Sequence, residues 1–139
     1  MNNYQIIVII GLPGSGKTRF SESFENYILY DDFVTHFYNG QLMNDIKAGK
    51  QVCINDPRLC IFDIFTKYMD ILTKYVDVDK IFLFLYENDS QQCLVNVEKN
   101  VSNTILEYSK LYDLSNYYSW NHKIIQVYSD TNLYRSKKF

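Results

Sequence analysis

Hydrophobic runs and amphipathic stretches alternate along this chain. Residues 5–10 read Gln-Ile-Ile-Val-Ile-Ile, and residues 80–86 read Lys-Ile-Phe-Leu-Phe-Leu-Tyr. Continuous apolar runs of this length are typical of strands that are covered on both faces, as in a parallel sheet. Shorter runs of the same kind predict three further strands, at 27–30, 51–55 and 123–128.

Helical patterns fill the intervals between these strands. They predict helices over 18–27, from Asp31-Asp32 through Tyr38, from Asp56 through Val76, from 88 through 97 and from Thr104 through Tyr112. Asp56 followed by Pro57 is a typical helix start, and Thr104 and Glu107 have the spacing of a capping box. Five alternations of strand and helix predict one α/β domain over 1–139, a three-layer α/β/α sandwich with a five-stranded parallel sheet.

A glycine-rich segment follows the first predicted strand. Residues 11–18 read Gly-Leu-Pro-Gly-Ser-Gly-Lys-Thr and fit G-x-x-x-x-G-K-[ST]; we call them the phosphate loop. Glycine permits backbone angles that turn successive N–H groups toward an anion. The Lys17 ammonium can neutralise the β- and γ-phosphates of a nucleotide, and the Thr18 hydroxyl can bind Mg²⁺. The residues predicted to bind a nucleoside triphosphate are Gly11, Pro13, Gly14, Ser15, Gly16, Lys17 and Thr18.

The charge and the length of the chain exclude several classes of phosphate-loop protein. The 139 residues include 14 Lys+Arg and 16 Asp+Glu, for a net charge of −2, so a broad basic surface for duplex DNA is not expected. GTPases need a guanine-reading Asn-Lys-x-Asp and a switch Asp-x-x-Gly, and neither pattern occurs here. Motor and helicase cores need longer chains. A small kinase fits these limits.

The cysteines and the apolar runs bear on the compartment. Cys53, Cys60 and Cys93 are odd in number and lack Cys-x-x-Cys spacing, so we expect reduced thiols rather than a disulfide framework or a zinc site. The first residues lack the pattern of a signal peptide, and no apolar run approaches the roughly 20 residues of a membrane helix. We therefore expect a cytoplasmic protein without a membrane partner.

The phosphate loop, followed by Asp31-Asp32 after a short strand, resembles the P-loop kinases related to polynucleotide 5′-kinase and zeta toxin. The resemblance implies a P-loop NTPase fold of the nucleotide-kinase type, with ATP and Mg²⁺ as cofactors. In that family the aspartate after the second strand is the base for the accepting hydroxyl, which implies this role for either Asp31 or Asp32. The strand ending at Asp56 is similar to the family's Walker B-like strand, which implies that Asp56 lies near the metal.

The chain departs from that family's pattern at two places. Val34 and Thr35 occupy the positions where family members often have an arginine that grips the acceptor phosphate. Asn96 and Asn100 occupy the positions of the usual lid arginines, and Lys99 is the nearest cation. Arginines that contact the transferring phosphoryl group can contribute about 10³-fold or more in rate.

Several candidate residues also have ordinary structural interpretations. Asp31 or Asp32 can cap a helix, although one acid is enough for a cap. Asp56 can cap a helix and still lie near a metal. Arg58 fits a surface arginine better than an acceptor-binding one, and Arg135 fits a solvated tail residue better than a nucleotide-binding one.

The pattern as a whole predicts an ATP- and Mg²⁺-dependent phosphotransferase. Its acceptor is a hydroxyl or phosphate of a nucleotide, a nucleic-acid 5′-end or a small metabolite. Lys17 and one of Asp31 and Asp32 are the predicted catalytic residues, and Thr18 and Asp56 the predicted metal-proximal ones. Two alternatives stay open: an ATP-binding module that transfers no phosphate, and an interaction protein with a vestigial phosphate loop.

Overall fold

The computed structural model describes residues 3–97 and 99–129. Within these residues five strands form one sheet in the order β2-β3-β1-β4-β5, and every neighbouring pair is parallel. The predicted α/β fold with a five-stranded parallel sheet is confirmed. The strands are β1 (Ile6–Ile10), β2 (Ile28–Tyr30), β3 (Val52–Asn55), β4 (Ile81–Tyr86) and β5 (His122–Ile125).

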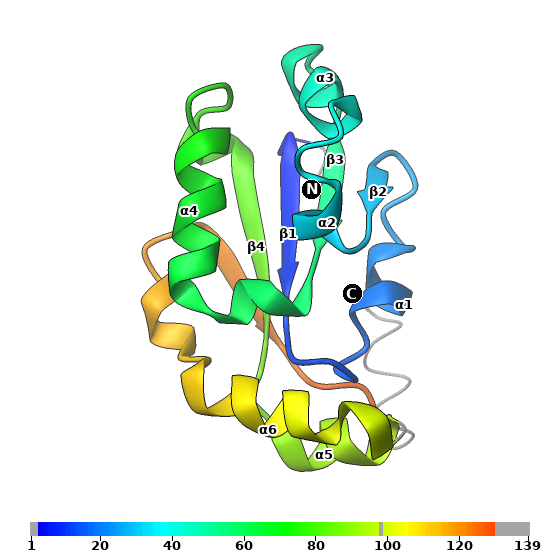
Figure 1. The fold of residues 1–139 in the computed structure, drawn as a ribbon. Coiled ribbons are helices and arrows are strands. Elements are labelled where there is room, and N and C mark those ends of the chain that lie inside the picture. Colours follow the sequence, from blue (N-terminus) through cyan, green and yellow to red (C-terminus); the bar gives the residue numbers. More distant parts are fainter. Residues whose placement is uncertain (1–2, 98, 130–139) are drawn as a thin grey trace.

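Helices flank this sheet and extend beyond one end of it (Figure 1). The α-helices are α1 (Lys17–Ser21), α2 (Phe33–His36), α3 (Gln41–Lys47), α4 (Phe62–Leu72), α5 (Ser90–Asn96) and α6 (Ser102–Leu111). Short 3₁₀ helices cover Pro57–Cys60, Val78–Lys80, Lys99–Val101 and Leu114–Tyr117. The pair α5 and α6 lies beyond the carboxyl ends of β1 and β4, at the bottom of Figure 1.

The core forms around the central strand. All five residues of β1 are buried, and β3 and β4 pair with the strand on either side: Val8 lies opposite Ile54 in β3 and Leu83 in β4. On α4 the buried residues Phe65, Met69 and Leu72 recur at helical spacing, as the sequence predicted. Burial on both faces explains why the run in β1 is apolar without alternation.

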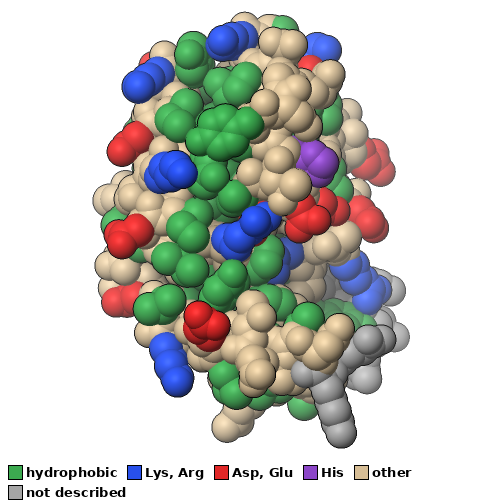
Figure 2. Space-filling view, viewed as in Figure 1, with side chains coloured by type: hydrophobic (Ala, Val, Ile, Leu, Met, Phe, Trp, Pro, Cys, Tyr) green, Lys and Arg blue, Asp and Glu red, His purple; other side chains and the backbone are tan. Residues whose placement is uncertain are grey.

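The surface carries charges of both signs. Helix α4 presents Asp63, Lys67 and Asp70 to solvent. On the face drawn in Figure 2, lysine and arginine side chains are interspersed with acidic and hydrophobic ones. In the ranges 3–97 and 99–129, no helix combines the length and the apolar character needed to cross a membrane.

Some helix boundaries differ from the prediction. The helix expected over 18–27 ends at Ser21, where the Ser21 and Ser23 hydroxyls bond to the carbonyls of Thr18 and Phe20 and compete with the helical pattern. Helix α2 ends at His36 rather than at Tyr38.

Two predicted caps are also wrong. Asp32 precedes α2 but has φ 49°, and its carboxylate accepts no capping hydrogen bond. Helix α6 starts at Ser102, directly after the 3₁₀ turn Lys99–Val101, so Thr104 lies inside the helix instead of capping it.

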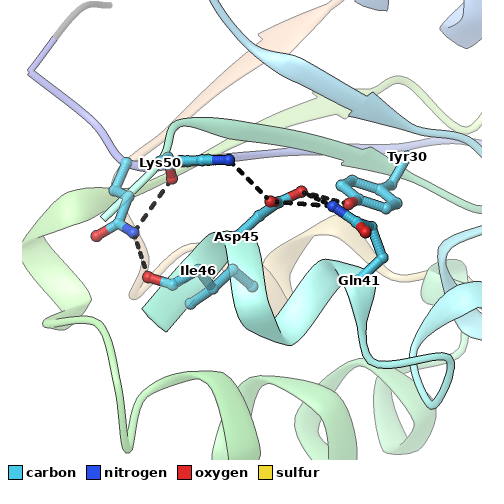
Figure 3. A network of polar contacts seen from close by, with 6 residues as sticks. Tyr30, Gln41, Asp45, Ile46 and Lys50 are labelled. Atoms are coloured by element: carbon cyan, nitrogen blue, oxygen red, sulfur yellow. Dashed lines mark hydrogen bonds and ion pairs between the residues drawn. The ribbon is translucent and has the colours of Figure 1, made fainter. Parts of the chain in front are cut away.

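Helix α3 has no counterpart in the sequence prediction, and a buried polar network ties it to β2 (Figure 3). The carboxylate of Asp45, which is 3% exposed, accepts hydrogen bonds from the Tyr30 hydroxyl (2.5 Å) and the Gln41 amide (3.2 Å) and pairs with Lys50 (3.5 Å). The bond from Tyr30 holds the pKa of Asp45 below its usual value, and partial burial together with this bond raises the pKa of Tyr30 to about 12. The network fixes the strand end directly before Asp31.

Candidate functional site

The phosphate loop lies where the topology of the sheet changes direction. The chain leaves β1 toward β2 on one side of it, whereas it leaves β3 in the opposite direction to reach β4. In open parallel sheets, right-handed crossovers then place the two connections on opposite faces and leave a crevice at the carboxyl ends of the strands. The loop after β1 and Asp56 after β3 both follow the carboxyl ends of these two neighbouring strands.

Two glycines give the phosphate loop its curvature. Gly14 has φ 85° and Gly16 has φ 104°, a left-handed conformation that side chains disfavour. At Gly11 the limit is space instead, because an added Cβ would lie 2.6 Å from Ser15 Oγ and 2.9 Å from Tyr86 Cβ. The predicted loop residues thus form one tight turn between β1 and α1.

Lys17 is the first residue of α1 and its side chain turns back over the loop. The residue is 7% exposed, and Nζ donates a hydrogen bond to the Leu12 carbonyl oxygen at 2.9 Å. Burial lowers the pKa of Lys17, and neighbouring thiols and carboxylates, those of Asp56 and Asp31 among them, oppose that shift. The ammonium is therefore held with little water around it, a state in which an added anion is strongly attracted.

The structure separates the two adjacent acids that the sequence could not rank. Asp31 is half-buried, and its Oδ1 atom is buried without a hydrogen-bond partner among the described residues. Asp31 also interacts electrostatically with Lys17. Asp32 is exposed and left-handed. Of the two acids, Asp31 is therefore the one that interacts with Lys17.

Asp56 caps a helix start, as predicted, but the predicted helix is interrupted: a 3₁₀ helix covers Pro57–Cys60, Ile61 is extended, and α4 begins at Phe62. The carboxylate of Asp56 also does more than cap. It is fully buried and accepts four hydrogen bonds, from Val34 N (3.0 Å) and from Arg58 N (2.9 Å), Nε (2.9 Å) and Nη2 (2.8 Å). These donors fill the roughly four acceptor positions of a carboxylate. A metal bound directly to Asp56 would have to displace one of them, so proximity to the metal stays a prediction for this residue.

Arg58 does not lie free on the surface, which is the position that the sequence favoured. It forms a two-point ion pair with Asp56 and donates a hydrogen bond to Thr35 Oγ1 at 3.0 Å. Its side chain remains 36% exposed, so part of the guanidinium still faces solvent. The sequence did contain a signal, because Asp-Pro-Arg puts an arginine within reach of its own capping acid. Residues 34 and 35, where the resemblance implied an arginine, both bind this Asp56–Arg58 pair.

The remaining predicted residues lie as follows. Thr18 is exposed in the first turn of α1, and Pro13 is half-buried in the loop. Asn96 ends α5 and bonds to the loop backbone. In residues 3–97 and 99–129, no three His, Cys, Asp or Glu side chains gather as metal ligands. Arg135 lies outside the described residues.

Comparison with known proteins gives a relative in a virus. No family model matches the chain. Uncharacterized protein R277 of Acanthamoeba polyphaga mimivirus is 35% identical over 134 residues, which cover 89% of this chain and 97% of the viral protein. The chain belongs to the same family as this viral protein. The match covers most of each chain and is not confined to one segment.

Proposed function

We propose that the protein is an ATP- and Mg²⁺-dependent phosphotransferase with a P-loop kinase fold. The observation that carries the proposal is the position of Lys17, a buried amine over a glycine turn with Asp31 in electrostatic range. A chance turn between strand and helix has no reason to bury a charge, since desolvation of a charge is costly. A triphosphate would offset that cost.

The loop residues fit the phosphates of a nucleotide. Ser15 Oγ is buried without a hydrogen-bond partner among the described residues, and such an orphaned hydroxyl suits a phosphate oxygen. The amides at the start of α1 add further donors and the positive end of a helix dipole. Mg²⁺ takes oxygen ligands and keeps several waters, so the Thr18 hydroxyl would fit an ion that also binds the phosphates. When bound, the ion neutralises charge on the phosphates.

Phosphoryl transfer then needs few groups. The acceptor hydroxyl oxygen forms a bond to the γ-phosphorus, the bond from that phosphorus to the β,γ-bridging oxygen breaks, and ADP leaves. Asp31 orients the hydroxyl and accepts its proton, and Lys17 stabilises the negative charge that develops on the phosphoryl oxygens. Arg58, held in place by Asp56 and Thr35, supplies positive charge on the acceptor side.

A second candidate function is nucleotide binding without transfer. It is favoured by Asn96, which occupies a position where the resemblance implies a lid arginine. The Asn96 amide instead donates to two backbone carbonyls, those of Gly14 and Tyr128. Helix α5 itself, with the sequence Ser-Gln-Gln-Cys-Leu-Val-Asn, contains no cation that could reach the phosphates. The two candidates agree on the site and differ in whether a phosphoryl group leaves it.

ADP formation from Mg²⁺–ATP separates the candidates. We expect acceptor-dependent ADP, matched mole for mole by a phosphorylated product, with one member of a panel containing nucleosides, nucleotides, a 5′-hydroxyl oligonucleotide and small hydroxylated metabolites. The reactions are followed by ³¹P NMR so that product and ADP are seen together. Saturable ATP binding without acceptor-dependent ADP for any class would contradict transfer and support the binding module.

A further inference from the structure

Three consecutive carbonyl groups of the phosphate loop are each bonded by a donor from a different part of the chain. The Gly14 oxygen accepts from Asn96 Nδ2 at 2.9 Å, at the end of α5. The Ser15 oxygen accepts from Tyr128 N at 3.0 Å, in the segment after β5. The Gly16 oxygen accepts from the Tyr86 hydroxyl at 3.2 Å, at the end of β4, and also from Phe20 N at 3.1 Å in α1. Asn96, Tyr86 and the Tyr128 backbone therefore surround the loop on its outer side.

Bonding these carbonyls outward determines where the neighbouring amides point. In a trans peptide unit the C=O and the N–H are directed to opposite sides. The N–H groups of Ser15, Gly16 and Lys17 follow the three held carbonyls, so they turn to the inner side of the loop. Ser15 N shows this direction, because it donates to the Leu12 oxygen at 3.1 Å, the acceptor that Lys17 Nζ also contacts; an anion would have to replace or share that bond.

The same outer elements pack against the loop so closely that only glycine fits. A Cβ added at Gly14 would lie 2.5 Å from Val97 Cγ1 and 2.7 Å from the Cys93 oxygen. A Cβ added at Gly16 would lie 2.9 Å from Tyr128 Cβ. Asn96 Nδ2 also donates to the Tyr128 oxygen at 2.7 Å, which joins two of the outer elements to each other.

We propose that Asn96 and Tyr86 are positioning residues that hold the amides of Ser15, Gly16 and Lys17 in an anion-binding array. The proposal rests on the proposed function, since it assumes that the loop binds a triphosphate. Three inward amides beside a buried ammonium form an anion-binding concavity. At position 96 this chain thus uses a neutral amide to shape the loop from outside, where the resemblance implied an arginine acting on the phosphate itself.

Asn96→Leu tests the proposal, with Asn88→Leu as the matched control. Asn88 Nδ2 also donates to two backbone carbonyls, Ser109 (2.9 Å) and Tyr112 (3.0 Å), so the control loses the same kind of contact without touching the loop. The probe is inorganic tripolyphosphate, measured by calorimetry below the unfolding temperature of every variant. We expect the Kd to rise at least tenfold for Asn96→Leu and to stay within twofold of the wild type for Asn88→Leu.

Tyr86→Phe removes only a hydroxyl and keeps the test decisive if Asn96→Leu does not fold. Its control is Tyr117→Phe, because the buried Tyr117 hydroxyl donates to the Leu59 oxygen at 2.5 Å, away from the loop. In ¹H–¹⁵N spectra, tripolyphosphate should shift the amides of Ser15, Gly16 and Lys17 in the wild type and shift them less in Tyr86→Phe. A purely structural role would lower the unfolding temperature and leave these shifts unchanged.

The outcomes separate this inference from the proposed function. If the wild type binds and the folded Asn96 or Tyr86 variant binds equally well with unchanged amide shifts, the positioning role is overturned and the proposed function stands. If the wild type binds neither tripolyphosphate nor ATP, both are overturned.

Discussion

Replacing Lys17 with methionine is expected to weaken ATP binding about 100-fold without loss of stability. Hydrogen bonds to charged groups contribute about 1.5–3 kcal/mol, and each 1.4 kcal/mol corresponds to roughly tenfold in affinity. Lys17 is nearly fully buried, so its charge is weakly screened and its loss falls at the upper end of this range. Methionine keeps an unbranched apolar stem of similar length in the same space.

Although Lys17→Met should weaken ATP binding, it should not lower the free energy of unfolding. Burial lowers the pKa of Lys17, which means that folding disfavours its charged form. In the wild type the free energy of unfolding should therefore rise as the pH increases from below the lowered pKa toward the ordinary value of 10.5, because the unfolded chain then binds more protons. Lys17→Met should lack this part of the pH dependence and be at least as stable at neutral pH.

Calorimetry with Mg²⁺–ATP and urea unfolding measure the two effects. Lys110→Met is the matched control, because Lys110 is exposed on α6 and its loss changes the net charge equally. The control should bind ATP within twofold of the wild type. Equal ATP affinity in Lys17→Met and the wild type would contradict a phosphate-binding role for Lys17.

Replacing Asp31 with asparagine is expected to slow phosphoryl transfer by about 10²–10⁴-fold while ATP binding changes little. A positioned general base contributes about that factor. Asparagine keeps the size of the side chain and one oxygen but cannot accept the hydroxyl proton. Asp31 is singled out by its buried, unpartnered Oδ1 atom and its interaction with Lys17.

Asp32→Asn provides the comparison within the same turn. Asp32 is exposed, so its replacement should change the transfer rate less than tenfold. Single-turnover transfer of the γ-phosphoryl group, with the acceptor found in the panel, gives the rates of both variants. A larger loss of transfer rate in Asp32→Asn than in Asp31→Asn would assign the base to Asp32 instead. No loss of rate in either variant would show that neither residue is the general base.

Features that depend on residues close in sequence were predictable from the sequence. The β1 run is apolar because both faces of the strand are buried, and the phosphate loop is recognised by its glycine spacing and Lys17. Asp56 before Pro57 predicted a cap, and the structure contains it. In each case residues close in sequence determine the conformation, so a single chain reveals it.

The features that the sequence did not predict depend on contacts between residues far apart in the chain. Helix α3 is stabilised by the bond from Tyr30 to Asp45, which no local pattern in 41–47 reveals. Asn96 reaches Gly14 across 82 positions of sequence, and Arg58 reaches Thr35 across 23. Such pairings depend on the fold bringing distant segments together, which is why Arg58 resembled a surface residue in the sequence.

A crystal structure with a non-hydrolysable ATP analogue and Mg²⁺ tests the central claim most directly. We predict β-phosphate oxygens within hydrogen-bond distance of the amides of Ser15, Gly16 and Lys17, with Lys17 Nζ moved from the Leu12 carbonyl to the phosphates. An ordered triphosphate bound elsewhere, or a Lys17 Nζ that contacts no phosphate oxygen at saturating nucleotide, would contradict a phosphate-binding loop.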